Sequence, residues 1–449
     1  MTRMLIRNVS VLVVPEHGDC RVDQAQDIHI TNDQITAITP TGVGEVGERE
    51  VIDGTGLVAV AGLVNSHTHS PMVMMRGAAE DLSIEDWFNR RIWPMEVNLT
   101  PERVRVGARL ACAEMLLAGV TTFVDHYFHA EQIAAAAIES GIRADLAPTF
   151  FSSTGHSTAG QDVIGAAFDV TRELSRVHPR ISASLGPHAT YTVTDDDLRR
   201  TADFARDEGF RIHLHAAETD DQTQASLDRH GVTPIQVLER TGVLDAGALI
   251  AHGCGIRESD LAILERYADR TTVASCPKVY LKLAMGEVTP IKGLRSAGVR
   301  VGIGTDGAAV HNTLDVWEAI RMVALTQKQR EHDAEWMTLS DTLRLATRGS
   351  AAAAGLADSI GVLEPGRQAD IALVDLNGPH NQPLHDPRAA LVYSVRASDV
   401  VTVLVAGQVV VRDRQLLTMD RDEVVAEARE LAHTLVDLSQ GGAVQHYAP

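Results

Sequence analysis

The amino-acid sequence predicts an α/β fold in which a TIM-like (β/α)8 barrel carries a small β-sandwich domain built from both termini. Three observations predict it: eight β-rich runs in the middle of the chain, amphipathic segments between them, and a two-residue alternation near both ends. The runs are almost continuously apolar, which is typical of parallel strands covered on both faces. An open, doubly wound sheet would use the same elements and is the alternative to a closed barrel.

The predicted strands are separated by segments with apolar residues at helical spacing, such as residues 101–119 and 258–269. The strands cover residues 58–67, 121–126, 143–151, 181–188, 210–218, 248–254, 271–277 and 300–307. Several helical segments end at a glycine just before the next strand, and glycine is common where helices stop. These glycines are Gly119, Gly141, Gly209 and Gly298. Eight strands, each followed by a helix, are expected to close into a barrel.

The two flanks of the chain differ from its middle. Residues 1–57 and 362–418 alternate apolar and polar residues between turn signals, a pattern typical of hairpins. We expect them to form one β-domain in two parts, with the barrel occupying residues 58–361. Residues 419–449 hold one amphipathic helix and a polar tail, which either cap the barrel or contact a second subunit.

Composition narrows the class of protein. A net charge of -20 argues against nucleic-acid binding, which needs an excess of Lys and Arg. No apolar run approaches the roughly 18 to 20 residues that span a bilayer, and the first residues lack the pattern of a secretory signal. The cysteines are scattered without CxxC spacing, so no disulfide framework is indicated. We expect a cytoplasmic protein with no membrane or nucleic-acid partner.

Histidine and carboxylate residues gather at the C-terminal ends of the predicted strands, which in such a barrel meet at one face and carry its chemistry. The stretch GLVNSHTHSPM ends the first strand with His67 and His69, whose side chains share one face of the strand. Further strand ends carry His188, His215, Glu218, His252 and Asp306. His213, in the same HLH run as His215, is expected to pack inside the barrel. Considered without the other residues, Asp306 could simply be a turn residue.

The chemistry of these side chains predicts a catalytic metal centre. The expected ligands are His67, His69, His215 and Asp306. Three imidazoles and a carboxylate suit one divalent ion, zinc or iron(II), with a position left for water. Such an ion lowers the pKa of bound water toward roughly 7 and makes hydroxide available for attack. Glu218 is then the expected proton shuttle, and His252 is the group expected to polarise the electrophile. We expect Asp306 to be a catalytic residue as well as a metal ligand.

The motifs GLVNSHTHSPM, HLHAAE, AHG and GTDG resemble those of the amidohydrolase superfamily, and the closing LEPGRQADIALVD is typical of it. The chain is similar to the branch of S-adenosylhomocysteine and methylthioadenosine deaminases, guanine-type deaminases and triazine chlorohydrolases. The resemblance implies the same metal ligands, with Glu218 as proton shuttle and His252 beside the metal water. It also implies a homo-oligomer. Binuclear members use a carboxylated lysine, but this chain has no lysine before Lys278, which indicates a single metal ion.

The same resemblance implies substrate contacts from Trp87, Glu96 and His188. Two stretches depart from the adenosine-type pattern. After the seventh strand the chain reads SCPKVYLKLAMG instead of HNPxSNLKLASG, so Lys278 either meets an anionic or carbonyl group of the substrate or is a solvated loop lysine. After the second strand it reads VDHYFH, which places His126 near the pocket.

Three functions are considered for a chain with these residues. The first is an aminohydrolase that releases ammonia from an aminated aromatic heterocycle of purine, pterin, pyrimidine or triazine type by attack of the metal hydroxide. The second is a related hydrolase that displaces chloride, a thiol, or an amide or carbamate nitrogen, because the same hydroxide serves all of these. The third is a noncatalytic scaffold, which the complete set of metal-binding side chains argues against. A small-molecule heterocycle is therefore the expected partner.

Overall fold

The computed structural model describes residues 2–43, 49–152 and 162–448. Its middle part holds parallel strands arranged in two sheets. These strands are β6 (Leu63–Thr68), β7 (Val120–Tyr127), β8 (Arg143–Phe150), β9 (Ile181–Ala183), β10 (Gly186–Pro187), β11 (Ile212–Ala216), β12 (Ala248–His252), β13 (Thr271–Ser275) and β14 (Arg300–Ile303). All eight predicted strands are present, although the predicted strand 181–188 is divided into β9 and β10.

The two sheets are joined at both ends. A parallel bridge between Leu185 and Ile212 connects the β9–β10 region to β11. At the other junction, the amide of Asp306 donates to the carbonyl of His67 at 2.9 Å, which ties the end of β14 to β6. The parallel strands therefore form a ring of the TIM-barrel type rather than an open doubly wound sheet.

The strands of both chain ends lie in one further sheet. Its members are β1 (Arg3–Val13), β2 (Arg21–Thr31), β3 (Gln34–Pro40), β4 (Glu50–Asp53), β5 (Leu57–Ala61), β15 (Ile371–Asp375), β16 (Val400–Val405), β17 (Gln408–Arg412) and β18 (Gln415–Leu416). The path runs β18-β17-β16-β15-β5-β1-β2-β3, with β4 paired to β1. Hydrogen bonding thus joins these nine strands into one sheet. The two-sheet sandwich predicted from the sequence stays a prediction, and so do the predicted domain bounds.

The predicted strand 58–67 is divided at Gly62, because its two halves pair in different sheets. β5 pairs with β15 in the sheet of the chain ends, whereas β6 pairs with β7 in the barrel. A Cβ at Gly62 would lie 2.2 Å from the side chain of Thr121, so only glycine fits at this crossing. The chain therefore passes from one sheet to the other within a single residue.

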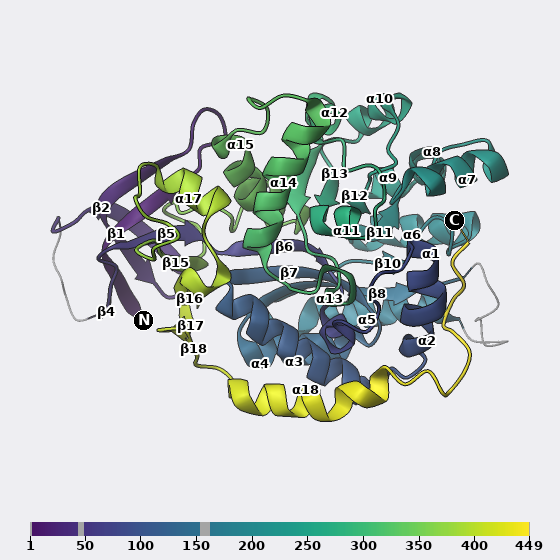
Figure 1. The fold of residues 1–449 in the computed structure, drawn as a ribbon, viewed down its shortest axis with the longest axis horizontal. Helices are drawn as coiled ribbons and strands as arrows, with labels where there is room; N and C mark the ends of the chain where they lie inside the picture. The colour runs from purple at the N-terminus through teal and green to yellow at the C-terminus, as the bar shows by residue number, and fades with distance from the viewer. Residues whose placement is uncertain (1, 44–48, 153–161, 449) are drawn as a thin grey trace.

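Helices surround the barrel strands (Figure 1). Their bounds are α1 (Ile84–Trp87), α2 (Trp93–Glu96), α3 (Pro101–Leu117), α4 (Ala130–Ser140), α5 (Val163–Val177), α6 (Asp195–Glu208), α7 (Asp220–His230), α8 (Pro234–Arg240), α9 (Val243–Ala246), α10 (Glu258–Arg266), α11 (Pro277–Lys282), α12 (Ile291–Ser296), α13 (Ala308–His311), α14 (Val316–Glu331), α15 (Leu339–Arg344), α16 (Ser350–Ala353), α17 (Pro387–Tyr393) and α18 (Arg421–Leu435). Short 3₁₀ or π turns cover Ser70–Met75, Phe88–Ile92, Leu345–Gly349 and Ala397–Asp399.

Local sequence signals explain where these helices begin. The side chain of Thr100 accepts a hydrogen bond from the amide of Arg103 and so caps α3, which starts with Pro101. α6 is capped in the same way by Thr194. Both helices end shortly before a glycine with positive φ, as in α6, where Gly209 has a φ of 76°.

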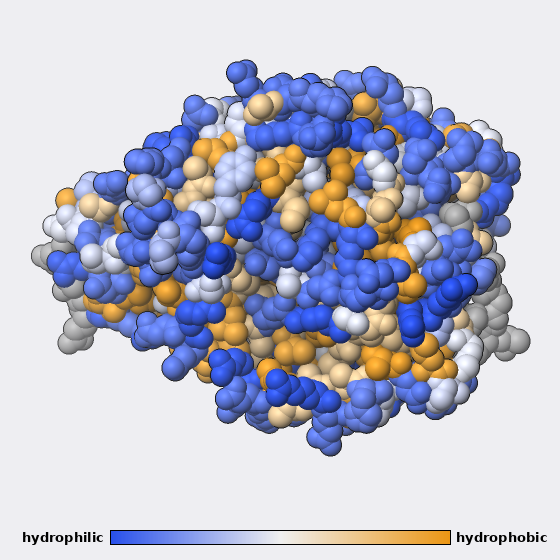
Figure 2. Space-filling view, viewed as in Figure 1, coloured by the Kyte–Doolittle hydropathy of each residue, from blue (hydrophilic) through white to orange (hydrophobic). Residues whose placement is uncertain are grey.

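The core is apolar and the surface largely polar. One large buried cluster extends through the barrel, and Trp93 and Trp317 are among its largest fully buried side chains. Figure 2 shows hydrophilic residues over most of one face, with apolar residues in smaller groups between them. Among the helices that the structure describes, none combines the length and apolar character needed to cross a membrane.

A buried ion pair fastens the barrel to the sheet of the chain ends. Arg143, at the start of β8, lies 3.3 Å from Asp370, and the side chains are 7% and 1% exposed. Asp370 also accepts a hydrogen bond from the amide of Ala406 at 2.7 Å, and its carbonyl accepts one from the amide of Gly62 at 2.8 Å. The carboxylate therefore receives its hydrogen bonds from both parts of the molecule.

Arg143→Ala is expected to lower the free energy of unfolding by about 3–5 kcal/mol, because it leaves the carboxylate of Asp370 buried without its counter-charge. Urea denaturation followed by circular dichroism measures the change. The control is Arg421→Ala, which removes an arginine that is 63% exposed and paired with an exposed Asp422. The control should be neutral, and equal effects of the two substitutions would show that the buried pair is not important for stability.

Candidate active site

Three histidines and one aspartate converge at the C-terminal end of the barrel. The Nε2 atom of His69 lies 3.1 Å from Oδ1 of Asp306, and that of His67 lies 3.6 Å from the same oxygen. The Nε2 atoms of His215 and His69 are 3.3 Å apart. His67 lies in β6 and His69 directly follows that strand, whereas His215 lies in β11 and Asp306 follows β14. The structure thus brings all four predicted metal-binding side chains together.

The second nitrogen of each imidazole is held by a neighbouring group. Nδ1 of His69 is 2.6 Å from the carbonyl of His126, and Nδ1 of His215 is 2.8 Å from the carbonyl of His188. Nδ1 of His67 lies 2.9 Å from Nε2 of His213. These contacts orient the rings so that Nε2 faces the centre of the cluster, an arrangement typical of metal-binding histidines.

The cluster has the donor atoms and the charge that a divalent cation needs. Nε2 of His67 is buried and has no hydrogen-bond partner among the described residues. Burial lowers the pKa of His67 to about 3, so the ring is neutral and its lone pair is free. Burial opposes ionisation of Asp306, but the imidazoles of His67 and His69, which face its carboxylate at 3.6 and 3.1 Å, outweigh this and hold the pKa of Asp306 well below its usual value. Burial opposes protonation of His69, but the hydrogen bond to Asp306 and the charge of that carboxylate raise the pKa of His69 to about 9, so a bound cation would replace the proton on this ring. Imidazole nitrogens and a carboxylate oxygen are suitable ligands for such an ion.

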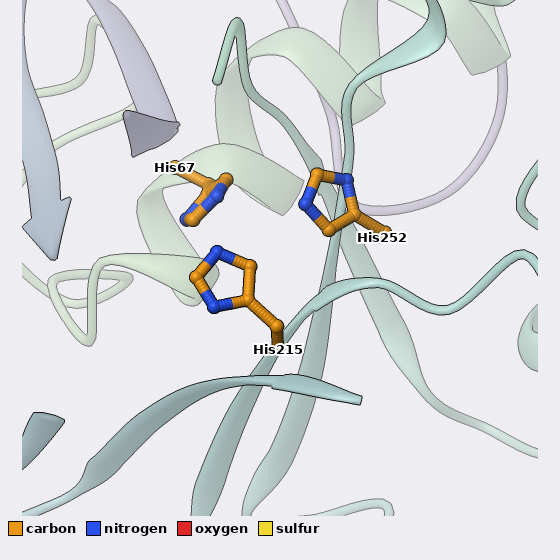
Figure 3. A group of neighbouring side chains, drawn as sticks. All are labelled: His67, His215 and His252. Carbon is orange, nitrogen blue, oxygen red and sulfur yellow. The ribbon is translucent and has the colours of Figure 1, made fainter. Parts of the chain in front are cut away.

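Among the residues that the structure describes, two overlapping groups of side chains could hold an ion, each with donor atoms within 4.8 Å of one another. One consists of His67, His69 and Asp306. The other consists of His67, His215 and His252, whose rings Figure 3 shows facing a common space from different elements. His67 is common to both groups and lies at the centre of the cluster.

Glu218 and His252 lie beside this cluster. Nε2 of His252 is 3.9 Å from Oε1 of Glu218 and 3.9 Å from Oδ2 of Asp306. The side-chain nitrogen of Gln222 donates to Oε2 of Glu218 at 2.9 Å. The side-chain oxygen of Gln222 accepts from the backbone amide of Glu218 at 3.1 Å. Burial raises the pKa of Glu218. A carboxyl group with a raised pKa is suited to accept and donate protons near neutral pH.

The backbone has positive φ at three non-glycine positions of this site, one of which is Ala217, between His215 and Glu218, with a φ of 48°. His252 has a φ of 71° and Asp306 a φ of 62°, a left-handed conformation that non-glycine residues rarely adopt. At Asp306 the conformation is held by Thr68, whose hydroxyl donates to the Asp306 carbonyl at 3.0 Å, and by the His67 carbonyl. Strain of this kind costs about 1–3 kcal/mol per residue and concentrates at functional sites.

A pocket opens over the cluster and is lined by its side chains together with aromatic and apolar groups. The lining includes Trp87, Phe88, Trp93, Glu96, His126, Tyr127, Phe151, His188, Glu218, Val279 and Leu283. Three predicted substrate-binding residues, Trp87, Glu96 and His188, are therefore in the pocket wall. Glu96 accepts a hydrogen bond from the hydroxyl of Tyr127 at 2.7 Å, and burial raises the pKa of Glu96 to about 7.

Lys278 differs from the other predicted substrate-binding residues. Its ammonium group lies 2.8 Å from the carboxylate of Glu318 on α14, and Lys278 does not belong to the described lining of the pocket. The same helix, α11, instead presents Val279 to the pocket, and Leu283 follows it. The departure in SCPKVYLKLAMG therefore makes this wall apolar, and the structure does not place a positive charge there.

The roles of some residues at the site could not be predicted from the sequence. His213 is buried as expected, but it also orients His67. Gln222 lies four residues after Glu218, a spacing that could have suggested contact. Nothing in the sequence indicates that Tyr447, near the end of the chain, lies 3.3 Å from Gln222.

Comparison with known proteins gives consistent results. Residues 58–410 match the model of the "Amidohydrolase family". A 5-methylthioadenosine/S-adenosylhomocysteine deaminase of Pelotomaculum thermopropionicum is 39% identical over 440 residues, which cover 97% of this chain and 100% of the relative. An adenosine deaminase from Xanthomonas campestris, crystallised with zinc, has a TM-score of 0.90 and 33% identity, covering 97% of this chain and 98% of that one. An atrazine chlorohydrolase from Arthrobacter aurescens, also with zinc, has a TM-score of 0.85 and 27% identity, covering 96% and 100%.

Proposed function

The chain belongs to the amidohydrolase family, and we propose that it is a metal-dependent deaminase that releases ammonia from the adenine ring of 5-methylthioadenosine or S-adenosylhomocysteine. It is a hydrolase that acts on carbon–nitrogen bonds other than peptide bonds. One observation carries the proposal: the cluster of three imidazoles and a carboxylate has a buried glutamate, Glu218, at its rim. The names of the relatives support the choice of an adenine nucleoside.

We propose that His67, His69, His215 and Asp306 hold one zinc ion. Two similar structures were crystallised with zinc, which supports this metal over iron(II). Nε2 of His67 is buried and has no hydrogen-bond partner among the described residues, as expected of a nitrogen that would bind the ion. When bound, the ion activates a water molecule as a nucleophile at neutral pH.

Glu218 moves the protons in the proposed reaction. Its Oε2 is occupied by the hydrogen bond from Gln222, which leaves Oε1, the oxygen nearer to His252, to accept the proton of the attacking water. The same carboxyl group then delivers a proton to the substrate, because an amine is a poor leaving group unless it is protonated. His252 lies where it can stabilise charge that develops on the substrate.

The pocket residues are suited to a flat heterocycle with a polar substituent. Trp87 and His188 contribute rings to the wall, and Glu96, whose Oε1 accepts from Tyr127, has its other carboxyl oxygen left for a hydroxyl group of the substrate. We therefore assign substrate binding to these three residues. Lys278 is left out of this proposal because Glu318 pairs with it.

Ammonia release across a panel of aminated heterocycles tests the proposed function. The zinc-loaded protein is incubated with 5-methylthioadenosine, S-adenosylhomocysteine, adenosine, guanine, a pterin, an aminopyrimidine, an amino-triazine and a chloro-triazine. We expect ammonia from the first two at the highest kcat/KM. Chloride release from the chloro-triazine without ammonia from any purine would overturn the deaminase proposal and favour the chlorohydrolase-like alternative. Turnover of guanine or an amino-triazine alone would overturn the substrate class.

A further inference from the structure

The end of the chain is built into the active-site wall. After α18 the described chain passes α2 and continues toward α1 (Figure 1). The amide of Val444 donates to the carbonyl of Trp93 at 3.3 Å. Tyr447 is 2% exposed although it is close to the C-terminus, whereas its neighbour His446 is exposed. Burial of one aromatic side chain so near a chain end needs specific contacts to hold it.

Tyr447 has such contacts on its backbone and on its ring. Its amide donates to the side-chain oxygen of Asn89 at 2.7 Å, and its carbonyl accepts from the side-chain nitrogen of Asn89 at 3.2 Å. The ring stacks on Phe88 with 5.1 Å between centroids and 12° between planes. Phe88 itself lines the substrate pocket. The tail therefore supports the pocket wall from behind.

The hydroxyl of Tyr447 is connected to Glu218, the predicted proton shuttle, through the side chain of Gln222. Gln222 lies with its side-chain nitrogen 3.3 Å from this hydroxyl and 2.9 Å from Oε2 of Glu218. The other end of the Gln222 amide is fixed by the backbone of Glu218. Burial and the nearby charge of Glu218 raise the pKa of Tyr447, so the hydroxyl keeps its proton at neutral pH.

We infer that Tyr447 is a positioning residue of the deaminase: through Gln222 it sets the orientation of the Glu218 carboxylate, and through Phe88 it sets the shape of the substrate pocket. This inference rests on the proposed function. The two effects separate by chemistry. The hydroxyl acts on proton transfer and therefore on kcat, whereas the ring acts on the pocket wall and therefore on KM.

Substitutions at Tyr447 distinguish these effects in the full-length, zinc-loaded protein. Tyr447→Phe keeps the ring and the backbone pair with Asn89, so we expect kcat for 5-methylthioadenosine to fall about 3- to 10-fold with KM unchanged. Tyr447→Ala also removes the stacking partner of Phe88, and we expect KM to rise as well. The control is His446→Ala, an exposed change in the same tail, which should behave as the wild type.

A double-mutant cycle tests whether Tyr447 acts through Gln222. Gln222→Met alone should lower kcat more than Tyr447→Phe does, because it removes the contact with Glu218 itself. Adding Tyr447→Phe to Gln222→Met should cause no further loss, since the path from the tail to Glu218 is already broken. Thermal unfolding of each variant shows whether the fold is intact.

Three results would overturn the inference. Tyr447→Phe with the kcat of His446→Ala would show that the hydroxyl does not position Glu218. Losses that multiply in the double variant would show that Tyr447 does not act through Gln222. Failure of the wild type and of His446→Ala to release ammonia from any substrate of the panel would instead reject the proposed function, and the inference with it.

Discussion

Glu218→Gln is expected to lower kcat for deamination by about 10²- to 10⁴-fold while zinc remains bound. The substitution keeps the size of the side chain but removes the carboxyl group that accepts and donates the proton, and general acid–base catalysis is worth about this factor. The metal should stay because Glu218 is outside the proposed ligand set and belongs to neither group of side chains that could hold an ion. Steady-state ammonia release and metal content by elemental analysis measure the two quantities.

A matched control is Glu239→Gln, which makes the same chemical change on α8, where Glu239 pairs with Arg266 at the surface. It should leave kcat and metal content unchanged. A Glu218→Gln variant with more than a tenth of the wild-type kcat would contradict the proton-shuttle role. It would favour a leaving group, such as chloride, that departs without protonation.

His67→Ala is expected to abolish both zinc binding and turnover, with kcat at least about 10³-fold lower. His67 belongs to both groups of side chains that could hold an ion, so its loss affects either arrangement. The barrel should still fold, because the strands on either side keep their backbone hydrogen bonds. Metal content, ammonia release and circular dichroism distinguish loss of the ion from loss of the fold.

The control for this variant is His433→Ala, which removes an exposed histidine from α18. Its zinc content and kcat should equal those of the wild type. Removal of zinc from the wild type with a chelator should reproduce the loss of turnover, and added zinc should restore it. If His67→Ala binds one equivalent of zinc and turns over normally, His67 is not a ligand and the assignment of the metal centre is wrong.

The residues that converge at the site could be predicted because their positions follow from local pattern. Strand periodicity places His67 and His69 on one face, and the repeat of strand and helix places His215 and Asp306 at the same end of the barrel. No long-range information is needed for this step, since all parallel strands of a barrel point the same way. The structure accordingly brings these side chains within hydrogen-bonding or ion-pair distance.

Other features depend on contacts between segments far apart in the sequence. The strand predicted at 58–67 changes sheets at Gly62, because its halves have different partners. The local sequence predicts that Lys278 faces the substrate or solvent, but the carboxylate of Glu318, forty residues later, pairs with it. The local residue pattern predicts neither the change of sheet at Gly62 nor the pairing of Lys278 with Glu318.

By itself, then, the sequence determined the barrel class, the end of the barrel that carries the chemistry and the side chains that gather there. These are properties of periodicity and residue type within short segments. Tertiary structure alone decided which atoms face one another: that His213 orients His67, that Gln222 holds Glu218, and that Tyr447 reaches Gln222. Such pairings depend on the packing of whole elements, and packing is a property of the folded chain rather than of any segment.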